Sequence, residues 1–197
     1  RHFMLKEIYE QPETAQLWID KYLPSDSSSK NSVALPISKS ILEKIEQIQI
    51  LACGTSRHAS MVGAYLLEQF AGVPTNVYFA SEFRYSPPPL SPNTLTIGVS
   101  QSGETADTLA ALRMEKERRD SLKDPDFSFH QLGITNRLDS SLARELDNVI
   151  DIGSGIEIGV AATKTFLGQM LSFYGLTLLF ASNKQKRSAQ EILDLSN

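Results

Sequence analysis

Residues 94–113 read TLTIGVSQSGETADTLAALR, and this stretch decides the fold class of the chain. An apolar, β-branched run ends at Ser100, hydroxyl and amide residues then surround Gly103, and a helix-period pattern begins at Ala106. The pattern predicts a strand, a tight turn and the N-terminus of a helix. In the first turn of a helix the backbone N–H groups have no partner within the helix, and the helix dipole adds partial positive charge there.

The predicted turn carries four polar residues that are candidates for binding a ligand: Ser100, Gln101, Ser102 and Thr105. Their hydroxyl and amide groups add donors to the free N–H groups of the helix, which suits a phosphate monoester or a sugar hydroxyl without a lysine. The alternative is that these residues only cap the helix, as serine and threonine commonly do.

A second unit of strand, turn and helix lies earlier in the chain. The apolar run 47–53, QIQILAC, breaks at Gly54, Thr55 and Ser56, and a helix pattern follows over 57–71. Thr55 and Ser56 are therefore candidates for the same kind of contact.

A third unit lies near the end of the chain. A short strand is predicted over 148–152, followed by the glycine-rich loop 153–159 and a long apolar helix over 160–180. The helix is apolar on most sides, which predicts that it is buried, with a partner domain or subunit as one candidate to cover it. Because the carboxyl ends of parallel strands meet at one edge of a sheet, three such turns favour ligand binding over capping.

Strands that alternate with helices predict an α/β fold of three layers, in which helices cover both faces of an open sheet. Further strands over 77–80 and 130–136 bring the sheet to five strands, mostly parallel and doubly wound as in flavodoxin. We expect residues 1–46 to form a helical lead-in with a polar linker at 24–32, residues 47–183 to form the binding domain, and residues 184–197 to begin a further helix.

Composition limits the classes of function. The chain has 197 residues, of which 41% are hydrophobic and 21% charged, as in a soluble globular protein. A net charge of −4 argues against nucleic acid as a partner. The single cysteine allows no internal disulfide, which favours a reducing, cytoplasmic location. No apolar run is expected to reach the length of a membrane span, and no signal peptide is visible. A chain that starts at Arg1 is expected to be a piece of a longer protein.

Several common sites are excluded or weak. The chain has no phosphate-binding loop of the Gly-x-x-x-x-Gly-Lys-Ser/Thr type, and no Gly-x-Gly-x-x-Gly follows the first strand. His2, His58 and His130 are scattered without ligand partners, so no metal site is predicted. His58 falls near Thr55 and could line a pocket, but a surface or packing role is the simpler interpretation.

Four other residues have both a chemical and a structural interpretation. Cys53 closes an apolar strand with no obvious base, which favours a small buried residue over a nucleophile. Glu104 would repel a phosphate, so we expect its carboxylate to point away or to hold a hydroxyl. Glu157 is the better acid/base candidate by position, although a structural role is common for such a residue. Lys164 is predicted to be a surface charge or one half of an ion pair.

Four motifs follow one another along the chain: CGTS at 53–56, ASEFRY at 80–85, SQSGETADT at 100–108 and EIGVAATK at 157–164, with KEIYEQP at 6–12 ahead of them. These motifs resemble the sugar isomerase (SIS) domain, and their order resembles the first SIS domain of the glutamine–fructose-6-phosphate aminotransferase family. The resemblance covers nearly the whole chain.

The resemblance implies fructose 6-phosphate as substrate and glucosamine 6-phosphate as product. It implies that Ser100, Gln101, Ser102 and Thr105 hold the phosphate. It also implies that Thr55 and Ser56 contact the sugar phosphate and that the Val160 backbone contacts the sugar.

For the parent protein the resemblance implies a cytoplasmic homodimeric aminotransferase without a metal or organic cofactor. The carboxylate and histidine that move the proton belong to a second SIS domain or a neighbouring subunit. The cysteine that releases ammonia begins a separate N-terminal glutaminase domain, so Cys53 is not that residue. This piece is therefore expected to bind sugar phosphate and to contain no catalytic residue. Ala162 departs from the serine that is more common in the family, and segment 118–129 is longer than usual.

Two other functions stay open at this point. A sugar-phosphate-sensing regulator would couple an SIS domain to a DNA-binding domain, although no helix-turn-helix or basic stripe is visible in the chain. A structural dimerisation module would use the apolar helix 160–180 as its interface.

Overall fold

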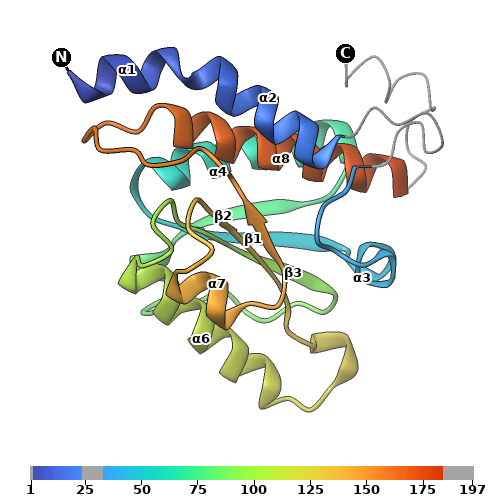
Figure 1. The fold of residues 1–197 in the computed structure, drawn as a ribbon. Helices are drawn as coiled ribbons and strands as arrows, with labels where there is room; N and C mark the ends of the chain where they lie inside the picture. Colours follow the sequence, from blue (N-terminus) through green and yellow to red (C-terminus); the bar gives the residue numbers. More distant parts are fainter. Residues whose placement is uncertain (1, 24–32, 184–197) are drawn as a thin grey trace.

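The computed structural model describes residues 2–23 and 33–183 (Figure 1). At its centre is a five-stranded sheet in which every pair of neighbouring strands is parallel. The strands are β1 (Gln47–Ala52), β2 (Thr75–Phe79), β3 (Thr94–Val99), β4 (His130–Thr135) and β5 (Val149–Asp151). Their order, β2-β1-β3-β4-β5, is that of flavodoxin. The predicted α/β, doubly wound fold is confirmed.

Strand register aligns the carboxyl ends of the sheet. Ala52 at the end of β1 pairs with Val99 at the end of β3, and Val99 pairs with Ile134 of β4. Thr135 at the end of β4 pairs with Asp151 at the end of β5. The segments that follow β1, β3 and β5 therefore leave the sheet along one edge.

Helices cover the two faces of the sheet, each over its own apolar core (Figure 1). On one face lie α1 (Phe3–Tyr9), α2 (Gln11–Tyr22), α4 (Gly54–Leu66) with its π-helical end (Leu67–Ala71), and α8 (Lys164–Asn183). On the other lie α5 (Ala80–Phe83), α6 (Ala106–Asp120) and α7 (Ser141–Glu145). The short helices α3 (Lys39–Lys44) and η2 (Pro125–Phe127) complete the described elements.

Helix α8 is buried within this chain, between α2 and α4. Trp18 of α2 is 1% exposed and lies so close to Gly175 that a Cβ there would come within 2.6 Å of its ring. A Cβ on Gly63 of α4 would overlap the ring of Phe173. The partner domain or subunit considered from the sequence is therefore not needed to cover this helix.

By length and composition α8 meets the criterion for a membrane span, so the expectation that no run reaches that length was wrong. Its most apolar stretch is 61% buried inside the protein, which is the pattern of a core helix.

Two predicted helix starts were wrong. Helix α4 begins at Gly54 instead of Arg57, because Gly54 adopts a left-handed conformation (φ +53°) that turns the chain directly from β1 into the helix. Thr55 and Ser56 thus lie in its first turn. Helix α8 begins at Lys164 instead of Val160, and the preceding segment 152–163 is a long loop without regular structure.

The predicted division into residues 1–46, 47–183 and 184–197 stays a prediction. The polar linker at 24–32 and the segment 184–197 lie outside the described residues. Helix α2 ends at Tyr22, whose hydroxyl bonds the backbone of Asp151, so the described lead-in is packed onto the sheet domain.

Candidate functional site

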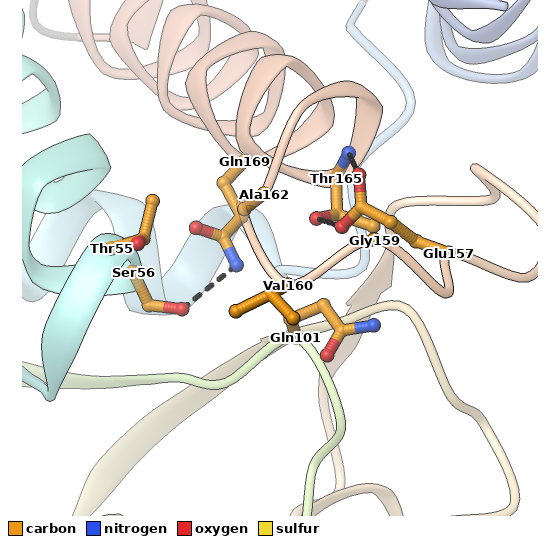
Figure 2. A pocket seen from close by; sticks show the side chains of 9 residues that line it. All are labelled: Thr55, Ser56, Gln101, Glu157, Gly159, Val160, Ala162, Thr165 and Gln169. Atoms are coloured by element: carbon orange, nitrogen blue, oxygen red, sulfur yellow. Dashed lines mark hydrogen bonds between the residues drawn. The ribbon is translucent and has the colours of Figure 1, made fainter. Parts of the chain in front are cut away.

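A pocket of about 210 Å³ lies at the carboxyl edge of the sheet (Figure 2). The segments that follow β1, β3 and β5 all contribute to its wall. It is lined by Thr55, Ser56, Gln101, Glu157, Gly159, Val160, Ala162, Thr165 and Gln169.

Four of the seven predicted ligand-binding residues share this pocket: Thr55, Ser56, Gln101 and Val160. They come from three separate segments, as the shared strand edge predicted. The other three, Ser100, Ser102 and Thr105, do not line it; they form the turn that carries Gln101 to its rim.

The turn after β3 is held by its own side chains. The hydroxyls of Ser100 and Thr105 lie 2.8 Å apart, and Ser100 Oγ accepts a hydrogen bond of 3.0 Å from Gly103 N–H. Ser102 Oγ accepts from Glu104 N–H at 3.2 Å. The hydroxyl of Thr105, at the cap position of α6, thus pairs with the hydroxyl of Ser100 and makes no capping bond to the first turn of the helix. The simple capping interpretation is therefore wrong for this residue.

The hydroxyl of Ser56 is held from the opposite helix. Gln169 of α8 is 2% exposed, and its side-chain nitrogen donates to Ser56 Oγ at 3.0 Å (Figure 2). Because Ser56 Oγ accepts this bond, its own proton is available to a ligand oxygen. The sequence analysis missed Gln169, and the only signal was a polar residue within an apolar helix.

The side chain of Glu157 caps the N-terminus of α8. Its carboxylate accepts from Thr163 N–H (2.8 Å) and Thr163 Oγ1 (3.0 Å), and from the hydroxyl of Thr165. The negative charge lies at the N-terminus of α8, where the helix dipole stabilises it. These bonds occupy both carboxylate oxygens, so the geometry favours a structural role over acid/base chemistry.

Other candidates lie away from the pocket. Glu104 Oε1 accepts from Ser141 N–H at 2.7 Å, and this bond lowers the pKa of Glu104. The carboxylate is thus held at Ser141, the first residue of α7. His58 is exposed and Cys53 is partly buried against the core under α6. Lys164 forms the predicted ion pair, 2.7 Å from Glu10, but it is buried instead of lying at the surface.

Metal binding finds no structural support in the described ranges. Within residues 2–23 and 33–183, no group of three or more histidine, cysteine, aspartate or glutamate side chains could hold an ion.

Residues 41–179 match the family model of the SIS domain. The chain belongs to the SIS domain family. This SIS domain is 54% identical to a glutamine–fructose-6-phosphate aminotransferase (isomerizing) of Synechocystis sp. over 98% of its length, and 53% identical to that of Thermosynechococcus vestitus over 99%. It spans only 31% and 32% of those relatives.

A solved structure gives the same picture. The C-terminal domain of glucosamine-fructose-6-phosphate aminotransferase from Francisella tularensis superposes on the whole of this chain with a TM-score of 0.85 at 39% identity. This SIS domain covers 53% of that structure. The family resemblance inferred from the motifs is confirmed.

The two departures from the family pattern lie in different places. Ala162, where the motif resemblance implies that serine is more common, lines the pocket with a methyl side chain. The long segment 118–129 leads into the amino end of β4 at His130, which is the edge of the sheet opposite the pocket. Only the first departure can alter ligand contacts directly.

Proposed function

We propose that this SIS domain is the sugar-phosphate-binding half of the isomerase part of a glutamine–fructose-6-phosphate aminotransferase. Its ligands are fructose 6-phosphate and the product glucosamine 6-phosphate. Two relatives that match almost the entire chain carry that enzyme name, which favours the enzyme over a transcriptional regulator.

The single observation that carries this proposal is the pocket shared by Thr55, Ser56 and Gln101 beside the N-terminus of α6. The phosphoryl group binds at the turn 100–105, where hydroxyls and first-turn N–H groups supply neutral and dipolar donors. The sugar extends across the pocket toward Ser56 and Val160. Glu104 is held by Ser141, which keeps its charge from facing the phosphate.

The isolated chain binds ligand without turning it over. The proton-transferring carboxylate and histidine are assigned to a second SIS domain or a neighbouring subunit, and the glutaminase cysteine to a separate domain. The parent enzyme is a cytoplasmic homodimer that uses no metal or organic cofactor in this proposal.

Titration of the chain with fructose 6-phosphate, followed by amide NMR, tests the proposal. We expect the largest shifts at residues 100–105 and at Thr55 and Ser56. Shifts confined to other regions contradict the assigned site.

Replacing Ser102 by leucine should abolish binding, because a bulky apolar side chain fills the space of the phosphoryl group and removes a donor. Ser182→Leu, at the far end of α8, is the matched control and should bind as the wild type does. Equal affinity in Ser102→Leu and the wild type would refute the role of Ser102.

A further inference from the structure

The loop 152–163 forms one wall of the pocket without regular structure of its own. Asn136 fixes its beginning: the side-chain oxygen accepts from Ser154 N–H at 2.8 Å, and the side-chain nitrogen donates to Gly155 O at 2.6 Å. Glu157 fixes its end through Thr163 and α8. The middle, which contains the pocket residues Gly159 and Val160, needs a third support.

Glu7 of the N-terminal helix α1 supplies that support. Glu7 is 3% exposed, and its carboxylate accepts hydrogen bonds from two consecutive backbone N–H groups, Ile158 at 2.6 Å and Gly159 at 3.1 and 3.2 Å. A buried carboxylate is stable only when such donors surround it. Figure 1 shows α1 beside the loop that precedes α8, although 151 positions separate Glu7 from Ile158.

Gly159 allows this close approach. A Cβ at position 159 would come within 2.5 Å of Glu7 Oε2 and 3.4 Å of the Met4 backbone. Any side chain there would therefore push the carboxylate or the loop aside.

A second contact joins the same helical segment to the same region. Glu10 lies 2.7 Å from the buried Nζ of Lys164, the first residue of α8, and 3.3 Å from Lys6. Two acidic residues of the lead-in thus hold the middle of the loop and the start of the helix that follows it.

We infer that Glu7 is a positioning residue for the sugar-phosphate pocket: it fixes the backbone of residues 158–159 and thereby the adjoining wall at Val160. The inference rests on the proposed function, because the ligand is the one proposed there. It gives the N-terminal helix a role in ligand affinity although Glu7 itself does not line the pocket.

Glu7→Gln tests the inference with little change of shape. Glutamine keeps one oxygen that accepts from Ile158 N–H, but its amide N–H groups cannot accept from Gly159 N–H. One of the two hydrogen-bonded contacts to the loop is therefore lost. We expect fructose 6-phosphate to bind about tenfold more weakly, the effect of losing one charge-assisted hydrogen bond. Calorimetric titration measures the affinity, and amide exchange in the free protein should accelerate at Ile158 and Gly159.

Glu13→Gln is the matched control, since Glu13 is an exposed residue of α2 and the change removes the same charge. It should leave both affinity and exchange unchanged. Unchanged affinity in Glu7→Gln, or a loss of unfolding free energy without a loss of affinity, overturns the positioning role. If the wild type itself fails to bind fructose 6-phosphate, the proposed function fails first and the ligand role of Glu7 with it.

Gly159→Ala tests the contact between Glu7 and residue 159 from the loop side. Alone it should weaken binding as much as Glu7→Gln does, because the added methyl group displaces the carboxylate. In a Glu7→Ala background the space is free, and Gly159→Ala should cause little further loss. Additive losses from the two changes would overturn the inference.

Discussion

Two segments border the pocket, and their central residues are held in different ways. In the turn 100–105 the side-chain bonds of Ser100 and Ser102 join residues at most five positions apart. In the loop 152–163 a central support is Glu7, 151 positions away. The first segment has side-chain bonds of its own in addition to its bonds to β4 and α7, whereas the middle of the second segment depends on an element at the other end of the chain.

The largest expected effect compares one glycine from each segment. Gly103 and Gly153 have the same left-handed φ of +67°, but a Cβ on Gly103 would overlap the buried Ser140 side chain, while a Cβ on Gly153 would meet open space. We expect Gly103→Ala to lower the free energy of unfolding by about 3 kcal/mol, from backbone strain and overpacking together. Gly153→Ala should cost about 1 kcal/mol, from strain alone.

Urea unfolding of the two variants measures this difference. Equal losses would show that the turn 100–105 is no more tightly enclosed than the loop.

An intermediate effect is expected from Glu157→Gln, which weakens the internal cap of α8. Loss of charge-assisted bonds to Thr163 and Thr165 should lower the free energy of unfolding by about 1–2 kcal/mol. Amide exchange should accelerate at Thr163 and stay unchanged at Ser102, because Glu157 bonds Thr163 and Thr165, whereas the Ser102 hydroxyl bonds Glu104 within its own turn. Faster exchange at both places would contradict the contrast between them.

The smallest effect concerns the pH dependence that Glu104 contributes. The hydrogen bond from Ser141 N–H lowers the pKa of Glu104 below the usual 4.5. The charged form of this side chain is therefore more stable in the folded state than in the unfolded state. This contribution is present above the unfolded pKa and is lost as pH falls through the lowered folded value. Glu104→Gln should therefore lie below the wild type in stability at about pH 6 and approach it at about pH 3.

Urea midpoints at the two pH values give the comparison. A constant difference between wild type and variant would mean that the Ser141 contact does not favour the charged form.

Hydrophobic period and turn chemistry were enough to predict the five strands and the turn 100–105, because these features depend on neighbouring residues. Residues with distant partners were not predictable in the same way. The hydrogen bond from Gln169 to Ser56 spans 113 positions, and no pattern in the neighbouring sequence of either residue predicts it. The start of α8 was placed too early because Val160 fits a helical pattern, whereas Glu157 caps the helix at Lys164.

The support from Glu7 and Glu10 also separates two definitions of where this domain begins. A shortened chain cut to the family match, residues 41–179, keeps all five strands and both hydroxyl turns. It lacks Trp18, which packs on α8. It also lacks Glu7, which bonds the loop, and Glu10, which pairs with Lys164. The smallest piece recognisable by sequence is therefore smaller than the piece that can keep its pocket in shape.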